Sequence, residues 1–173
     1  MELKDIITAI AALVGMVLGI YNYLHARAAD RVRLRVVPKS SSYQGKDFTG
    51  REFYLHNKDR FDIHHPTYPP DTLSVEVVNL SKFPVTVDEI GLRSRWRKTR
   101  LVLVNPVLAD RGPWPRKLEP RESVTASFDL TSLIDSDHLP SVTHAYATTI
   151  CGSTCLGESG ALKELVLTLK NAA

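Results

Sequence analysis

The pattern of apolar and polar positions divides the chain into one long apolar run and a series of short alternating segments. No Asp, Glu, Lys or Arg occurs between Asp5 and Arg27, a run of 21 residues. A helix rises about 1.5 Å per residue, so the apolar core of this run, 6–24, would span roughly 28 Å, close to the hydrocarbon thickness of a bilayer. The pattern predicts one N-terminal transmembrane helix.

Alternation of apolar and polar residues, which is typical of strands with one buried face, begins soon after this helix. Residues 31–36 alternate strictly between arginine and an aliphatic side chain. Alternation recurs in 73–77, after Val85 and in 124–130, and the apolar or β-branched runs 101–104 and 142–151 add further strands. The run 101–104 is expected to be buried on both faces. Six or more short strands separated by turns predict a β-sandwich.

Residues 73–92, L-S-V-E-V-V-N-L-S-K-F-P-V-T-V-D-E-I-G-L, resemble the paired strands of immunoglobulin-like sandwiches, particularly those of uncharacterised bacterial membrane-anchored proteins. With the later segment E-P-R-E-S-V-T-A-S-F-D, the resemblance covers about 60 residues. It implies an all-β chain, an immunoglobulin-like β-sandwich preceded by one N-terminal transmembrane α-helix. A resemblance at the level of the fold carries no catalytic residues with it.

These patterns predict two parts. Residues 1–30 form a transmembrane anchor with a basic juxtamembrane segment, and 31–173 form the β-sandwich domain. Within the domain, 38–71 lacks periodicity but is rich in aromatic residues. Because pure linkers are poor in aromatic residues, we expect an irregular, ordered insertion there.

The C-terminal segment 161–170 fits two patterns. Leu162, Leu165, Val166 and Leu169 have helical spacing, with Ser159 as a candidate N-cap. The same segment alternates in V-L-T-L, whose residues favour strands, and a closing edge strand is common in sandwiches. The sequence leaves both open and favours the strand.

Composition and charge refine this organisation. The chain has 43% hydrophobic and 24% charged residues, which argues against disorder throughout, and its net charge of +3 is too small to indicate a nucleic-acid binder. Five basic residues follow the helix within 25–39 against one acid, and one lysine precedes it. This asymmetry predicts an N-terminus outside and a cytoplasmic domain at the inner (plasma) membrane. The alternative is an exported domain, released by signal-peptide cleavage near Ala28.

Small residues follow one face of the predicted helix. Ala11, Gly15 and Gly19 are spaced by four and permit close approach of two helices, so they are candidates for self-association into a homo-oligomer. Many membrane helices carry such spacings without associating.

Basic residues gather in two places and are candidates for contact with anionic lipid or another polyanion. An alternative is a solvated hairpin whose arginines keep an edge strand from aggregating. Nucleic acid is not favoured, because no binding motif accompanies these residues. The candidates are Arg31, Arg33, Arg35, Arg93, Arg95, Trp96, Arg97, Lys98 and Arg100.

The two cysteines, Cys151 and Cys155, flank a three-residue turn. Residues directly opposite in a hairpin can have Cα atoms about 4.5 Å apart, within disulfide range. The pair is therefore a candidate disulfide, reduced in the cytoplasm and closed in an exported domain.

No catalytic motif occurs, and we expect no metal and no cofactor. His56, His64 and His65, together with nearby aspartates, lack a recognised metal-ligand spacing, so a polar surface loop is the favoured interpretation. The sequence predicts a membrane-anchored, non-enzymatic interaction or scaffold protein whose sandwich binds an unknown protein partner at the cytoplasmic membrane face. The alternative is an oligomerising membrane effector or sensor that perturbs the bilayer through its helix.

Overall fold

The structure is a computed structural model of the whole chain. It describes residues 3–46, 48–50, 52–61, 72–94, 100–104, 106–130, 133 and 138–172. The chain forms two compact units, Met1–Val32 and Arg33–Ala173, and each is described by itself.

The first unit is a single helix, α1 (Leu3–Ala29). Its large apolar side chains are exposed along the described part of the helix, from Ile10 at 59% to Leu24 at 57%. The Tyr21 ring stacks on the His25 ring one turn later, with centroids 6.0 Å apart. The predicted helix is therefore present, and it carries apolar surface that no other part of the unit buries.

Among the residues that the structure describes, no helix is both long enough and apolar enough to cross a membrane. The transmembrane part of the prediction is thus not supported. The described apolar side chains of α1 share the helix with the polar Asn22, His25 and Arg27. Ile6 and Ile7, which begin the predicted span, have side chains outside the described residues.

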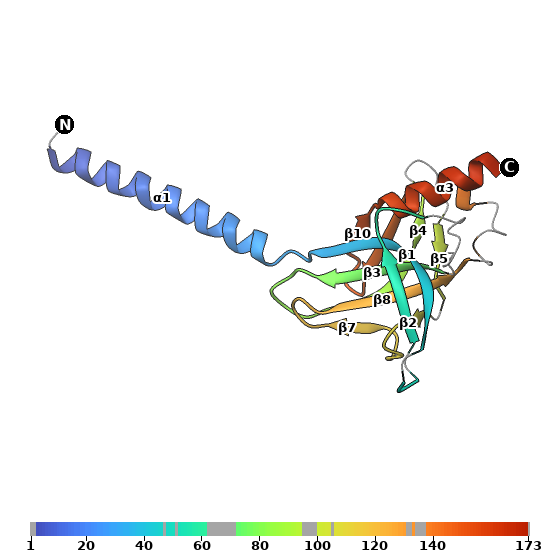
Figure 1. Cartoon of the computed structure of the whole chain (residues 1–173). Helices are drawn as coiled ribbons and strands as arrows, with labels where there is room; N and C mark the ends of the chain where they lie inside the picture. The colour runs from blue at the N-terminus through green and yellow to red at the C-terminus, as the bar shows by residue number, and fades with distance from the viewer. Residues whose placement is uncertain are drawn as a thin grey trace. The chain divides into compact units, whose positions relative to one another are not determined.

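The second unit contains two antiparallel sheets (Figure 1). In the described residues, the first sheet, sheet A, has the order β2-β1-β3-β8-β6. In β8 every second residue is buried, as its sequence pattern predicts, whereas in β3 Ser74 and Val78 of the opposite face are buried as well. The strands are β1 (Leu34–Lys46), β2 (Glu52–Asn57), β3 (Thr72–Asn79), β6 (Val107–Leu108) and β8 (Ser123–Asp129).

The second sheet, sheet B, has the order β10-β9-β4-β5, and β7 also pairs with β4. A register shift between Val87 and Glu89 interrupts the pairing of β4 with β9. The strands are β4 (Val85–Arg93), β5 (Arg100–Val102), β7 (Arg116–Leu118), β9 (His144–Thr149) and β10 (Thr154–Gly157).

The core is built from the buried side chains of both sheets. Successive side chains of a strand point to opposite faces, and the face of each sheet that is directed toward the core supplies mainly aliphatic residues. Leu73, Val75 and Val77 of β3 and Val87 and Ile90 of β4 are completely buried. The prediction of a domain built mainly from two antiparallel sheets is confirmed at this coarser level.

The C-terminal segment is a helix, α3 (Gly160–Ala172), so the favoured strand prediction is wrong. Leu162, Leu165 and Val166 form one buried face, and the helix packs beside β1 and the short 3-10 helix η1 (Leu139–Ser141). The backbone N–H of Leu162 donates to the Ser159 hydroxyl at 3.1 Å, which is the N-cap that the helical alternative required.

Two further predictions need correction. The region 38–71 is more regular than expected, because β1 continues through Pro38 to Lys46 and β2 pairs back along it. Pro38 is tolerated because β2 pairs only from Ser40 onward, so β1 has no β2 partner there. The run 101–104 is not buried on both faces, since Val104 is 81% exposed.

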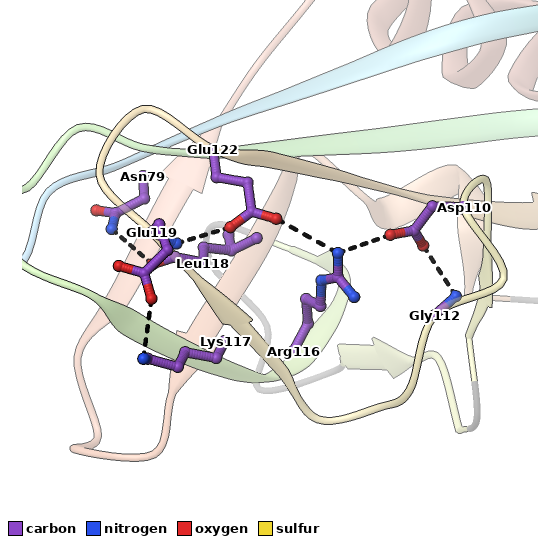
Figure 2. A network of polar contacts seen from close by, with 8 residues as sticks. All are labelled: Asn79, Asp110, Gly112, Arg116, Lys117, Leu118, Glu119 and Glu122. Atoms are coloured by element: carbon purple, nitrogen blue, oxygen red, sulfur yellow. Dashed lines mark hydrogen bonds and ion pairs between the residues drawn. The ribbon is translucent and has the colours of Figure 1, made fainter.

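A polar network fastens the segment 110–122 to the end of β3 (Figure 2). Arg116 Nη2 lies 2.8 Å from Asp110 Oδ2 and 3.3 Å from Glu122 Oε1. The Glu122 carboxylate also accepts the backbone N–H of Glu119 at 2.8 Å. Buried Asn79 donates from Nδ2 to the carbonyls of Phe83 and Leu118, at 2.9 and 3.0 Å. Most of these groups are paired within the network, although the buried Arg116 Nε has no hydrogen-bond partner among the described residues, so the network acts as a structural brace.

Candidate functional site

The outer face of sheet A, the face directed away from the core, carries hydroxyl side chains on three neighbouring strands. The register places Ser41 of β1 opposite His56 of β2, and Ser74 of β3 opposite Ser127 of β8. These positions alternate with the core residues of the same strands, so the period-2 pattern that buries the core also lines up the hydroxyls.

A chain of hydrogen bonds crosses these strands. Ser41 Oγ lies 2.7 Å from His56 Nδ1 and 2.5 Å from Ser74 Oγ, and Ser74 Oγ lies 3.5 Å from Ser127 Oγ. Ser41 and Ser74 are each only 1% exposed. Buried hydroxyls require partners, and this chain supplies them.

The electrostatic surroundings favour a neutral His56. Burial lowers the pKa of His56 below its ordinary value of 6.5, and the nearby Lys39 ammonium lowers this pKa further. The Glu76 carboxylate opposes both effects. Lys39 and Glu76 are themselves paired at 3.1 Å. A neutral imidazole keeps one ring nitrogen as donor and one as acceptor, so it can end the serine chain in either sense.

This pKa shift predicts a pH-dependent contribution to stability. The unfolded state, with a His56 pKa near 6.5, binds a proton more readily than the folded state. The stabilisation is therefore complete above pH 6.5 and is lost as the pH falls below it. We expect the difference in unfolding free energy between the wild type and His56→Gln to shrink as the pH falls from 7.5 to 5.0. Urea denaturation at intervals across this range measures it. A difference that grows toward low pH would contradict the assigned shift.

The serine chain forms part of the wall of a pocket of about 900 Å³ on this face, here called the outer-face pocket. Its volume falls in the range of small-molecule sites. Hydroxyls, the Tyr54 and His56 rings and charges of both signs line it. The lining residues used below are Ser41, Tyr54, His56, Ser74, Arg111 and Asp129.

Arg111 enters the pocket from a loop with an unusual backbone. Its φ is +53°, in the left-handed region that residues other than glycine seldom adopt, and its N–H donates to the Leu108 carbonyl at 3.0 Å. Such conformations cost of order 1 kcal/mol or more and tend to occur at functional positions. The loop thus places a guanidinium at the pocket.

The arrangement fits binding better than nucleophilic catalysis. A Ser–His pair at 2.7 Å is the spacing of an activated nucleophile. The Ser41 hydroxyl is nevertheless almost completely buried and also bonded to Ser74, so a substrate carbon has little room to approach Oγ. An aromatic row of Tyr43, Tyr54 and His56 runs beside it, with centroids 5.7 and 6.5 Å apart. Mixed donors and acceptors next to aromatic rings suit recognition of a polar partner.

The described residues predicted to contact polyanions lie on different elements of the chain. Arg31, Arg33 and Arg35 are exposed. Arg100 pairs with Arg93 across β4 and β5 and binds Glu89 at 3.2 Å, so an acid already neutralises part of this patch. The predicted residues Arg95, Trp96, Arg97 and Lys98 lie outside the described residues.

The small-residue face of α1 is open. A side chain added at Gly15 or Gly19 would meet nothing within 4 Å. Ala11 is exposed on the same helix. The face is therefore accessible, and whether it pairs with another helix stays a prediction.

The two cysteines do not face each other as expected. Cys155 of β10 lies opposite Ala147 of β9, whereas Cys151 lies in the turn before β10. Both are free thiols. Hydrogen bonds from Thr149, then Ser153, to the Cys151 sulfur lower its pKa. The prediction that Cys151 and Cys155 lie opposite each other in the hairpin is therefore wrong, because Cys151 lies in the turn and outside the paired residues of β9 and β10.

Within the part of the chain that the structure describes, no group of His, Cys, Asp and Glu side chains could hold a metal ion. The predicted candidates His64 and His65 fall outside that part. Sequence reasoning missed Ser41 and His56 as site residues. Only strand register brings them together, and β2 had no sequence signal strong enough to predict that register.

No family model, curated protein or solved structure matches this chain. The residues and their geometry are therefore the basis for proposing a function.

Proposed function

We propose that this chain is a membrane-attached, non-enzymatic interaction protein. Its helix α1 attaches it to a bilayer through apolar side chains, and its sandwich binds a partner through the outer face of sheet A. The domain is proposed to lie at the cytoplasmic face of the membrane; the predicted outside location of the N-terminus would require α1 to cross and is not part of this proposal.

The exposed apolar surface of α1 is the observation that carries the attachment. Large apolar side chains on this helix are about half exposed or more, from Val14 at 49% to Leu13 at 60%. Contiguous exposed apolar surface of this kind marks interaction with a membrane or another protein. No helix in the described residues is both long enough and apolar enough to cross a membrane. We therefore propose that α1 attaches to the bilayer and do not propose that it crosses.

The strand order supports an immunoglobulin-like identity for the sandwich. In that fold one sheet has the order A-B-E-D and the other contains C, F and G. Here β1-β3-β8-β6 can be read as A-B-E-D and β10-β9-β4 as G-F-C. Sandwiches of this architecture are common as interaction domains, and β2, β5 and β7 are additions to it.

The outer-face pocket supports the binding role. It combines the Arg111 guanidinium and the Asp129 carboxylate with hydroxyls and the Tyr54 ring. Groups of both charges and both hydrogen-bonding senses suit a polar surface of a partner protein. The near-complete burial of Ser41 is the reason to propose binding without chemistry.

Flotation of the full chain with vesicles of phosphatidylcholine and phosphatidylglycerol tests the attachment. The wild type is expected to rise with the vesicles. Val14→Asp combined with Leu18→Asp should lower the floating fraction at least about tenfold, because each charge placed in apolar surroundings costs about 2.5 kcal/mol or more. The proposal fails if this double variant floats like the wild type.

A matched control adds the same charges elsewhere. Ser123 and Asn171 are exposed positions of the second unit. Ser123→Asp combined with Asn171→Asp changes the net charge equally without altering α1, so it should float like the wild type. Equal losses in both double variants would indicate that net charge, and not the apolar surface of α1, controls attachment.

A further inference from the structure

The outer-face pocket extends across sheet A from one end of its strand order to the other. Its lining residues come from all five strands, from Tyr54 on β2 to Val107 on β6. Neighbouring strands lie about 4.8 Å apart, so the four intervals between them span roughly 19 Å. An extended chain rises about 3.3 Å per residue, so this width matches a segment of about six residues.

Short hydroxyl side chains fill the middle of the pocket. Ser41 and Ser74 are buried and bonded to each other, whereas Thr72, Thr125 and Ser127 are partly exposed. A hydroxyl can both donate and accept a hydrogen bond. The partly exposed hydroxyls therefore match the N–H and C=O groups that every residue of an extended peptide other than proline presents.

The Arg111 guanidinium stands at the β6 end of the pocket, three residues after the end of that strand. Arg111 is exposed, and no acid in the described part of the chain forms an ion pair with it. The neighbouring Asp110 carboxylate is instead paired with Arg116 at 2.8 Å (Figure 2). The guanidinium of Arg111 is therefore available to an anion from outside the chain.

The backbone that carries Arg111 is held in place on both sides. The Arg111 N–H donates to the Leu108 carbonyl, and the Gly112 N–H donates to Asp110 Oδ1 at 3.0 Å. A Cβ atom at position 112 would lie only 2.5 Å from Arg116 Nη1, so the close packing there requires glycine. A loop that is ordered before binding loses less conformational freedom when a ligand arrives.

The charge of the pocket favours one carboxylate. Among the described lining residues, Arg111 and Lys46 are basic and Asp129 is acidic, and the lowered pKa of His56 keeps its ring neutral at neutral pH. One positive charge is thus in excess, and a guanidinium binds a carboxylate through two parallel hydrogen bonds. A nucleic-acid strand, with a phosphate at every residue, would meet uncharged hydroxyls over most of this width, so the pocket does not suit it.

We propose that the outer-face pocket binds an extended segment of about six residues from a partner protein, with one carboxylate of that segment on Arg111. This inference deepens the proposed function and rests on it, because it assumes binding through the outer face of sheet A. At the β2 end, the Tyr54 ring is 44% exposed and suits an apolar or aromatic side chain of the segment. The carboxylate belongs to an Asp or Glu side chain or to the end of the partner chain, two sources that the test separates.

Arrays of random hexapeptides provide the test. In one array the peptides are attached through their C-termini, so only side chains supply carboxylates. In the other they are attached through their N-termini, with the C-terminus either free or amidated. Both arrays include phosphoserine. The full chain is applied in mild detergent as the wild type, Arg111→Gln, Arg111→Glu and Tyr54→Ala.

Arg121→Gln is the matched control for Arg111→Gln. Arg121 is also exposed and also has a positive φ, +68°, but it does not line the pocket. The two substitutions remove the same charge from the same kind of backbone position. A general effect of net charge or of backbone strain would therefore appear in both variants.

We expect the wild type to bind peptides with a carboxylate at one fixed position at least tenfold more strongly than the same peptides with Gln or an amide there. Arg111→Gln should abolish this preference, and Arg121→Gln should keep it. Arg111→Glu should replace it with a preference for Lys or Arg, because the charge at the pocket is reversed.

Three results would overturn the inference alone: a preference for phosphoserine over Asp and Glu, a carboxylate preference that survives in Arg111→Gln, or binding without any carboxylate preference. In these cases loss of binding in Tyr54→Ala would show that the outer face of sheet A still binds peptides, so the proposed function would stand. If no peptide binds the wild type, or if Tyr54→Ala binds the same peptides equally well, the proposed binding face fails together with this inference.

Discussion

Replacing Asn79 with alanine is expected to lower the free energy of unfolding by about 4 kcal/mol. The Asn79 side chain is completely buried and makes three hydrogen bonds to the backbone. It donates to the carbonyls of Phe83 and Leu118 and accepts the Ser81 N–H at 2.9 Å. Each buried backbone group left without a partner costs about 1–3 kcal/mol. Urea denaturation of the wild type and the variant measures the change.

Asn57 offers a matched control, because it also ends a strand and holds a turn. Its Oδ1 accepts the N–H groups of Asp59 and Arg60, at 2.9 and 3.2 Å. These groups are exposed, so water replaces the lost acceptor, and Asn57→Ala should cost about 1 kcal/mol or less. Similar losses in the two variants would mean that burial of Asn79 does not set its importance.

Replacing Gly157 with alanine is the second change expected to have a large effect. Gly157 ends β10 where that strand passes close to β1. A Cβ atom at this position would overlap the carbonyl of Val36, which is backbone and cannot turn aside. We expect a loss of about 3 kcal/mol in unfolding free energy, since β1 or β10 must shift to accommodate the methyl group.

The neighbouring Leu156 provides the comparison for this change. It lies in the same strand and is 49% exposed. Leu156→Ala removes apolar contacts without creating an overlap, so it should cost about 1 kcal/mol or less. If Gly157→Ala is as stable as Leu156→Ala, then β1 and β10 do not lie close enough for a Cβ atom at position 157 to overlap the Val36 carbonyl.

The parts of the fold that the sequence predicted are those where one local pattern dominates. Alternation located β3 and β8, because in each strand every second residue is an apolar residue of the core. The apolar run located α1. In each case the residues that decide the structure are neighbours in the sequence.

The parts that it missed depend on contacts between distant segments. In α3, the β-rich segment V-L-T-L favours a strand locally, but burial of Leu162 and Leu165 beside β1 and η1 stabilises the helix. The strand β2 has little alternation of its own. It forms because β1 continues past Pro38 and offers an edge for pairing.

In the candidate site too, the sequence predicts what depends on a local pattern and misses what depends on contacts between distant segments. Ser74 could be placed on the polar face of its strand from the sequence alone. Its contact with Ser41, and the contact of Ser41 with His56, depend on the registers of β1 with β3 and β2. The prediction that the two cysteines face each other was wrong for the same reason, because the turn places Cys151 before the paired residues of β10.

The most direct test of membrane attachment is flotation of the wild-type chain with the same vesicles in 1 M NaCl. At that ionic strength the Debye length is about 3 Å, so attraction between exposed arginines and anionic lipid is largely screened. Burial of the apolar side chains of α1 is not weakened by salt. We predict that the floating fraction in 1 M NaCl equals or exceeds the fraction at 0.1 M. A chain that stays at the bottom of the gradient, or floats only at low salt, would contradict attachment through α1.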